Sequence, residues 1–313
     1  MKLFLPLSIL TTLFVATPMQ GGFICQELLL KGEMAFFPED VLPPTKIKYD
    51  VYGRYEPGKK VIVLLHGLGG SKRTWEAIGK ELSKEFYVIA PDSRGHGLTE
   101  YSGDYFSTSM MASDLRGLLR QLNVSKVSLV GHSMGGRTAA RFAERYPEMV
   151  EKLMIEDMHM KGRSKLLPNQ LDLARAIRAL PKHYGNTQEA VNTLRKFFGE
   201  DYIRETILGK FSQPAPGGGI DVTYNFNSEA AYRLYENQGL QEELGPVIGQ
   251  TKAPSLFMAA SPDKGAVLFG VGLEHLQKSK PDARVVHFHD AGHSIHHDSP
   301  ERFVATVSGF VRE

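Results

Sequence analysis

The chain has 313 residues and a formal net charge of +2, from 37 basic and 35 acidic side chains. A hydrophobic share of 42% and a charged share of 23% are ordinary for a folded globular protein, and they exclude a disordered or collagen-like chain. The charge balance gives no electrostatic reason to expect nucleic acid or an anionic membrane as a partner. The single cysteine, Cys25, excludes an internal disulfide and a cysteine metal site.

The N-terminus has the features of a secretory signal. Lys2 precedes an apolar stretch, residues 3–16, which at about 14 residues is shorter than the ~20 that a membrane span requires. A lipidation site at Cys25 would require a small residue before it, but Ile24 is large. We predict that residues 1–22 are a signal peptide and that the protein is periplasmic or secreted, without stable membrane insertion after processing. An uncleaved anchor and a lipidated Cys25 are the alternatives.

From residue 46 onward, short apolar runs alternate with helical patterns, which is typical of a mostly parallel sheet flanked by helices. The run Ile47–Val51 alternates with polar residues, as a half-exposed strand does, whereas Val61–Leu65 is continuously apolar, as a strand buried on both faces is. Further strands are expected at residues 86–90, 127–130, 152–155, 255–258 and 284–288. Helices are expected at residues 71–82, 115–122 and 134–146, and in a last helix that begins at Ser299-Pro300-Glu301.

The alternation stops between about Met158 and Gly249. This stretch has helical patterns and a Pro/Gly-rich break at residues 213–219, and it is too long for a loop inside a compact domain. We therefore predict an inserted helical cap over residues 158–250. The cap would divide an α/β core into a first part, 23–157, and a second part, 251–313.

Gly131-His-Ser-Met-Gly135 comes directly after an expected strand and opens an expected helix. In this context Gly-x-Ser-x-Gly predicts a nucleophile elbow, a turn so sharp that only hydrogen fits at the two glycines. The turn lifts the hydroxyl of Ser133 above the sheet edge, and it aims the amide of Met134 at the reacting oxygen. We predict that Ser133 is a nucleophile.

A second glycine-rich loop, His66-Gly-Leu-Gly-Gly70, follows the buried strand Val61–Leu65. Such a loop presents bare amides, and an oxyanion hole requires two of them. A phosphate-binding loop is the alternative, but its Gly-Lys-Ser/Thr ending is absent here.

Together with Pro-Asp-Ser-Arg-Gly-His-Gly at residues 91–97, these motifs resemble the α/β-hydrolase family over about residues 46–312, apart from the insertion. The resemblance implies a serine hydrolase that uses no cofactor, with the amides of Leu68 and Met134 as the oxyanion donors. In that family the segment 92–97 is a structural signature, so we assign Asp92 and His96 no catalytic role.

Ala291–His296 lies between the last expected strand and the last helix. A general base must reach the serine and still hand its proton on, which a loop at the sheet edge allows, and the order serine, acid, histidine agrees with the family. We predict that His293 is this base. A metal site is the alternative for the five histidines here, but no carboxylate or cysteine motif at ligand spacing supports it: His287, His289, His293, His296 and His297.

Two aspartates compete for the role of the third triad member. Asp263 follows the penultimate strand, 30 residues ahead of His293, and most members of the family use this position. Asp157 ends the preceding strand, 24 residues after Ser133, and a smaller group of short-chain esterases with a Gly-His-Ser-Met-Gly-Gly elbow uses that one. Either carboxylate could orient the imidazole, so the acid stays open between them. Glu156 is left out because its side chain should point to the opposite face of the strand from that of Asp157.

These residues predict two-step acyl transfer on a small-molecule ester, with Ser133 attacking and His293 moving the proton. A carbon–carbon bond hydrolase and a cofactor-free peroxidase or lyase share the fold and are the enzymatic alternatives. A non-enzymatic binding module is the alternative from another class, and the intact serine, histidine and acids argue against it.

Overall fold

The computed structural model describes residues 45–99, 106–160, 176, 179–196, 202–208, 212–222 and 243–313. The signal segment predicted at residues 1–22 and Cys25 lie outside these ranges, so export stays a prediction. Within the described ranges, none of the helices combines the length and the apolar character that crossing a membrane requires.

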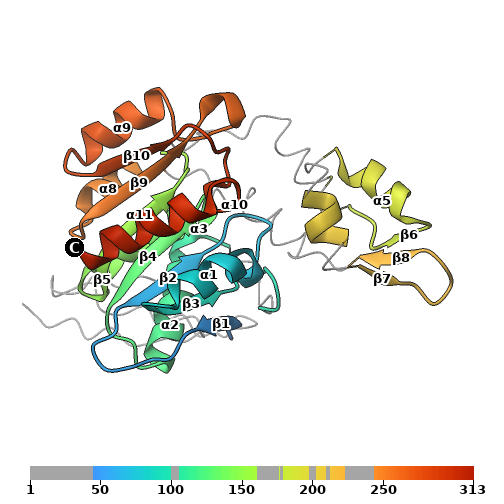
Figure 1. Ribbon diagram of the computed structural model, residues 1–313, viewed down its shortest axis with the longest axis horizontal. Helices are drawn as coiled ribbons and strands as arrows, with labels where there is room; N and C mark the ends of the chain where they lie inside the picture. The colour runs from blue at the N-terminus through green and yellow to red at the C-terminus, as the bar shows by residue number, and fades with distance from the viewer. Residues whose placement is uncertain are drawn as a thin grey trace, which may run out of the picture. The chain divides into compact units, whose positions relative to one another are not determined.

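Seven strands form one sheet in the order β1-β3-β2-β4-β5-β9-β10 (Figure 1). Strand β1 pairs antiparallel with β3, and the other neighbouring pairs are parallel. The mostly parallel sheet predicted from the sequence is therefore confirmed. The strands are β1 (Tyr49–Tyr52), β2 (Val61–Leu65), β3 (Tyr87–Pro91), β4 (Val127–His132), β5 (Val150–Glu156), β9 (Ser255–Ala260) and β10 (Arg284–Phe288).

Helices cover both faces of the sheet, which is why its central strands are apolar throughout. In β2, Ile62 and Leu64 pack in one core cluster with residues of α1 and α11, whereas Val63 packs in the other with residues of α2 and α3. The helices on the first face are η2 (Lys72–Trp75), α1 (Glu76–Leu82), α10 (Ile295–Asp298) and α11 (Pro300–Arg312). Those on the second face are α2 (Thr108–Gln121), α3 (Met134–Arg145), α8 (Gly245–Gln250) and α9 (Val271–Ser279).

Local capping explains where several helices begin. The hydroxyl of Ser71 accepts a hydrogen bond from the amide of Arg73 at the start of η2, and Ser107 caps α2 through the amide of Met110. Pro300 is the first residue of α11, where a backbone amide has no acceptor within the helix. Proline, which lacks an amide hydrogen, therefore loses no hydrogen bond there.

The described part of the insertion is not purely helical. It contains α5 (Thr187–Leu194), the π-helix η4 (Tyr202–Leu208) and a small antiparallel sheet in the order β6-β8-β7. The strands of this sheet are β6 (His183–Tyr184), β7 (Ser212–Pro214) and β8 (Ile220–Val222). The Pro/Gly-rich run that we interpreted as a break between helices is the turn of the β7–β8 hairpin, where Gly218 and Gly219 have φ of 94° and 81°.

The insertion begins and ends at one point of the core. The amide of Leu244 donates to the carbonyl of Met160 at 3.0 Å. Helix α8, which the sequence analysis placed in the cap, packs Val247 and Ile248 into the core cluster that contains α3. The core therefore resumes near residue 244.

The chain order of the strands reverses at β2 and β4. These two strands are neighbours, but the chain runs from β2 into helix α1 on one face and from β4 into α3 on the other. The direction in which the chain leaves the sheet therefore reverses between β2 and β4. In parallel α/β sheets such a point is where ligands bind.

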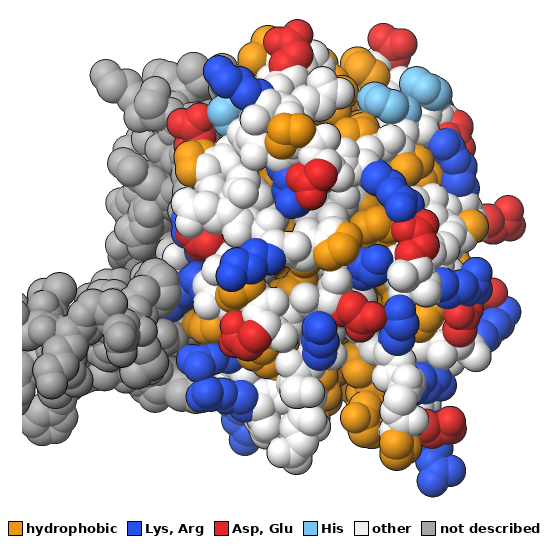
Figure 2. All heavy atoms as spheres, turned by 90° about the vertical axis from the view of Figure 1, so that its left-hand side faces the viewer, with side chains coloured by type: hydrophobic (Ala, Val, Ile, Leu, Met, Phe, Trp, Pro, Cys, Tyr) orange, Lys and Arg blue, Asp and Glu red, His pale blue; other side chains and the backbone are white. Residues whose placement is uncertain are grey.

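Acidic and basic side chains are interspersed on the face of the molecule drawn in Figure 2, and neither sign dominates it. This distribution accords with the net charge of +2.

Candidate functional site

Ser133 occupies a strained turn between β4 and α3. Its φ of 50° and ψ of −112° are unusual for a residue with a side chain; such strain costs about 1–3 kcal/mol and persists only where the surroundings enforce it. Close packing enforces it here. A Cβ atom on Gly131 would lie 2.4 Å from the carbonyl oxygen of Gly135, and one on Gly135 would lie 2.2 Å from that of Leu65. The amide of Ser133 also donates to the carbonyl of Glu156 on β5 at 3.0 Å.

His293 is held by Asp157. Its Nδ1 donates to Asp157 Oδ2 at 2.6 Å, so Nε2 is the ring nitrogen left for another partner. The Asp157 side chain is fully buried, whereas the His293 side chain is 35% exposed. The amides of Val267 and Leu268 donate to the same carboxylate at 2.9 and 3.0 Å. Three donors on one buried carboxylate leave it a single orientation.

Asp263, the other candidate acid, lies in the short 3-10 helix η5 (Pro262–Lys264). It is exposed, and its carboxylate makes no hydrogen bond or ion pair with His293 or with another residue that the structure describes. Of the two aspartates, the structure brings only Asp157 to the imidazole.

The loop after β2 passes directly over Ser133. A Cβ atom on Gly67 would lie 3.4 Å from the Cβ of Ser133 and 2.6 Å from Nδ1 of His132. The next residue is Leu68, whose amide donates to no acceptor among the described residues. Met134 is the first residue of α3, so its amide has no acceptor within the helix. Both predicted oxyanion donors thus flank the serine with free amides.

His132 links the serine turn to the loop of His293. Its Nε2 donates to the carbonyl of His293 at 3.0 Å, and the two rings have centroids 4.6 Å apart. Among the described residues, no hydrogen bond engages the hydroxyl of Ser133. Contacts of this kind often tighten only when substrate binds.

Glu156 and His296 form a buried pair beside the site. The sequence analysis missed this pair. His296 donates to the Glu156 carboxylate from its amide at 2.9 Å and from Nδ1 at 2.8 Å. Burial alone would raise the pKa of Glu156, but the electrostatic attraction of His296 and the hydrogen bonds from its ring and amide hold the pKa below its ordinary value. Two features of the sequence could have predicted the pair: two adjacent acidic residues at the end of a strand, and a second histidine three residues after His293.

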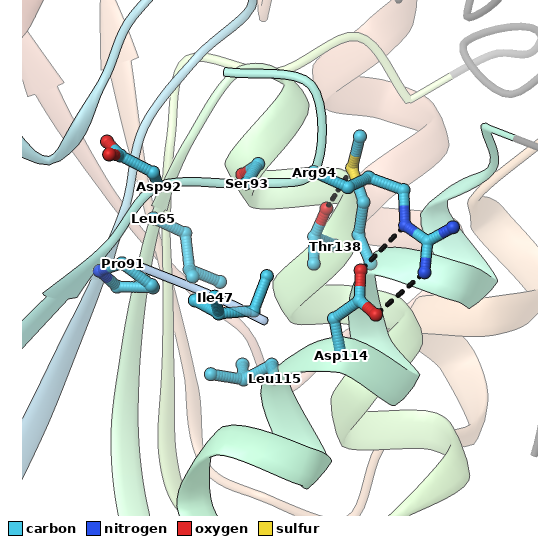
Figure 3. A pocket seen from close by; sticks show the side chains of 10 residues that line it. Ile47, Leu65, Pro91, Asp92, Ser93, Arg94, Asp114, Leu115 and Thr138 are labelled. Carbon is cyan, nitrogen blue, oxygen red and sulfur yellow. Dashed lines mark hydrogen bonds and ion pairs between the residues drawn. The ribbon is translucent and has the colours of Figure 1, made fainter. Parts of the chain in front are cut away.

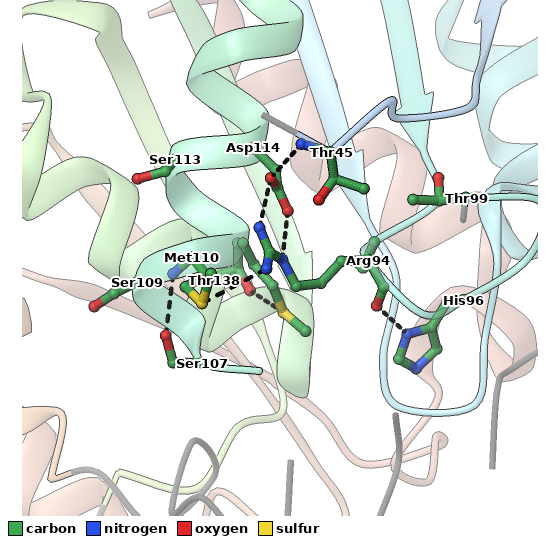
Figure 4. Close-up of polar contacts among 12 residues, drawn as sticks. Thr45, Arg94, His96, Thr99, Ser107, Ser109, Met110, Ser113, Asp114 and Thr138 are labelled. Atoms are coloured by element: carbon green, nitrogen blue, oxygen red, sulfur yellow. Dashed lines mark hydrogen bonds and ion pairs between the residues drawn. The ribbon is translucent and has the colours of Figure 1, made fainter. Parts of the chain in front are cut away.

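The segment after β3 is held by a polar network (Figure 4). Arg94 donates to both carboxylate oxygens of Asp114, from Nε at 2.6 Å and from Nη2 at 2.7 Å. His66 accepts from the amide of Ser93 at 3.0 Å, which fastens the loop after β2 to the loop after β3. The absence of a catalytic role for this segment remains an expectation, and its contacts are those of a scaffold.

A small pocket opens beneath this segment (Figure 3). Neither Ser133 nor His293 lines it, so it is separate from the reacting groups. Its lining combines apolar side chains with the Arg94–Asp114 ion pair: Ile47, Leu65, Pro91, Asp92, Ser93, Arg94, Met111, Asp114, Leu115 and Thr138.

The histidines expected to compete as metal ligands are dispersed. The rings of His287 and His289 stack at the exposed end of β10 with centroids 5.7 Å apart. The described part of the chain contains no group of three or more potential metal ligands.

Acid should destabilise this fold through its buried histidines. Burial lowers the pKa of His66 to about 4 and the pKa of both His96 and His132 to about 3, from an ordinary value of 6.5. Below pH 6.5 the unfolded chain therefore binds protons that the native rings reject, so the free energy of unfolding falls as the pH drops toward about 4. Burial raises the pKa of Asp92 and Asp114, which offsets part of this loss at the acidic end.

Urea unfolding at several values between about pH 7 and pH 5 measures this dependence. His96→Gln removes one of the three rings, so its stability should decline less steeply with falling pH. A wild-type stability that stays constant over this range would contradict the prediction.

Comparisons with known proteins agree with this fold. A mouse (Mus musculus) protein named sn-1-specific diacylglycerol lipase ABHD11 is 30% identical over 259 residues, which cover 80% of each chain. A solved structure named Marine microorganism esterase has a TM-score of 0.70 and 24% identity, covering 85% of this chain and 99% of its own. That of E-2-(acetamidomethylene)succinate hydrolase has a TM-score of 0.70 and 23% identity, covering 85% and 95%. Residues 60–300 match the family described as alpha/beta hydrolase fold, and this chain, a hydrolase, belongs to that family.

Proposed function

We propose that this hydrolase cleaves a carboxylic ester or a related acyl bond of a small molecule through an acyl-enzyme on Ser133. The observation that carries the proposal is the 2.6 Å hydrogen bond from His293 to the buried Asp157, on a loop that His132 joins to the strained serine turn. The lipase name of the mouse relative supports an ester as the substrate.

In the first step, His293 Nε2 takes the proton of the Ser133 hydroxyl as its oxygen attacks the substrate carbonyl carbon. The carbonyl oxygen becomes an oxyanion, which the amides of Leu68 and Met134 stabilise. The tetrahedral intermediate then collapses, and the alcohol leaves with the proton from His293. Asp157 keeps the imidazole in the tautomer that can accept the proton, and it stabilises the imidazolium.

In the second step, water attacks the acyl carbon and gives its proton to His293. Collapse of this intermediate returns the proton to Ser133 and releases the carboxylic acid. The serine, the histidine and the acid are restored, and no cofactor enters the balance.

A fluorophosphonate probe tests the nucleophile, and a panel of p-nitrophenyl esters of increasing acyl length tests the reaction. We expect a single adduct on Ser133 in the folded chain and hydrolysis that disappears in Ser133→Ala. A vinylogous diketone in the same panel distinguishes a carbon–carbon bond hydrolase. An adduct or full turnover in Ser133→Ala would refute the proposal.

A further inference from the structure

Three side chains at the ends of two neighbouring strands hold the segment that carries His293 by hydrogen bonds. Asp157, just after β5, holds the His293 imidazole, and His132, the last residue of β4, holds the His293 carbonyl. Glu156, the last residue of β5, holds His296. Residues 132 and 156 are register partners in the β4–β5 pair, so the three side chains lie together at the carboxyl end of these strands.

The Glu156 carboxylate is buried and makes several hydrogen bonds to His296. Its side chain has no exposed surface, and both of its oxygens lie within 2.9 Å of His296 Nδ1. The amide of His296 is the second in α10, where a helix offers no acceptor, and Glu156 Oε1 accepts it at 2.9 Å. A side chain from a distant strand thereby caps this helix.

The His296 ring is confined on its other sides. Trp75 packs against it with ring centroids 4.4 Å apart, and Phe303 contacts it at 6.1 Å. His132 packs edge-on at 5.1 Å. Burial lowers the pKa of His132 to about 3, so at neutral pH this ring is uncharged and donates only from Nε2, to the carbonyl of His293.

These contacts compensate for a weakness of the local structure. His293 lies in an irregular turn, and the helix that follows has only four residues, too few to be stable by itself. A general base displaced by about 1 Å can lose about 10²-fold in rate. The Asp157 hydrogen bond fixes one ring nitrogen, but it does not fix the backbone from which the ring extends.

We propose that Glu156, through His296, is a positioning residue that fixes the backbone of residues 293–296 and thereby keeps His293 Nε2 directed at Ser133. The inference rests on the serine hydrolase mechanism proposed above. The two adjacent acids of β5 then have separate tasks: Asp157 orients the imidazole, and Glu156 orients the segment that carries it.

Glu156→Gln tests this assignment, because glutamine keeps the size of the side chain but carries no negative charge and presents an NH2 group in place of one of the two oxygens that face His296 Nδ1. In the full-length chain we expect kcat on the best p-nitrophenyl ester to fall about 10- to 100-fold while KM changes less than about twofold. The downfield NMR signal of the proton shared by Asp157 and His293 should weaken as well. A merely structural role would move neither kcat nor this signal in the folded enzyme.

Two further variants keep the test decisive. The double variant Glu156→Gln/His296→Gln removes both members of the pair, so neither is left as a buried group without its partner, and if the two residues act as a pair its kcat should be no lower than that of the worse single variant. Val311→Ala destabilises α11 at its far end, where Val311 is fully buried, and should lower the melting temperature with kcat unchanged.

A folded Glu156→Gln enzyme with wild-type kcat and an unchanged proton signal would overturn the positioning role. If Ser133→Ala is inactive in the same experiment, the hydrolase mechanism stands and only this inference is lost. Turnover in Ser133→Ala would remove the mechanism itself.

Discussion

Asp157→Asn is expected to lower kcat on a p-nitrophenyl ester about 10⁴-fold, the loss known for this change in serine proteases with the same triad. The wild-type carboxylate accepts three hydrogen bonds, from His293 Nδ1 and from the amides of Val267 and Leu268. An asparagine has one accepting oxygen, so its NH2 group must face at least one of these donors. If it faces His293, the ring proton moves to Nε2, which can then no longer accept the proton of Ser133.

The matched control is Asp263→Asn, which replaces an exposed aspartate on the same side of the fold by the same residue. We expect its kcat and KM to stay within about twofold of wild type, because its carboxylate does not contact His293. Steady-state kinetics and fluorophosphonate labelling rates measure both variants. A large loss in Asp263→Asn, with Asp157→Asn nearly intact, would reverse the assignment of the acid.

Gly135→Ala is expected to remove the serine turn altogether. The new Cβ would lie 2.2 Å from the carbonyl oxygen of Leu65 and 2.8 Å from that of His66, and both are backbone atoms. Neither can move without displacing β2 and the loop that carries Leu68. We expect the free energy of unfolding to fall by about 4 kcal/mol or more, and labelling of Ser133 to be lost.

Gly309→Ala is the control for this substitution. Gly309 lies within α11, and a Cβ atom there would meet nothing within 4 Å. Alanine is the better helix former by about 1 kcal/mol, so this variant should be at least as stable as wild type. Urea unfolding compares the two alanine variants directly, and equal stability of Gly135→Ala and wild type would show that the turn tolerates a side chain.

Most of the central sheet could be predicted because its signals are local. The apolar run Val61–Leu65 can only be a strand buried on both faces, and the glycines around Ser133 are required by the turn itself. The choice between Asp157 and Asp263 could not be made in this way. Both follow strands that end at the same sheet edge, and which one reaches His293 depends on how the loops fold back.

Two other differences between the sequence-based predictions and the structure also have physical causes. Alternation along the strand is the reason that the sequence analysis left Glu156 out, but residues 291–296 cross the end of β5 and meet the side chains of both Glu156 and Asp157. In the insertion, strands of two or three residues are too short to show an alternating pattern, so β6, β7 and β8 were missed.

The hydrogen bond from Leu244 to Met160 has an evolutionary consequence. A stretch of chain whose two ends are neighbours can lengthen, shorten or be exchanged without shifting the strands on either side, because loop-closure entropy grows only slowly with length. Asp157 lies three residues before this junction, and His293 comes well after it. Selection can therefore change the insertion while leaving the reacting groups in place on the core.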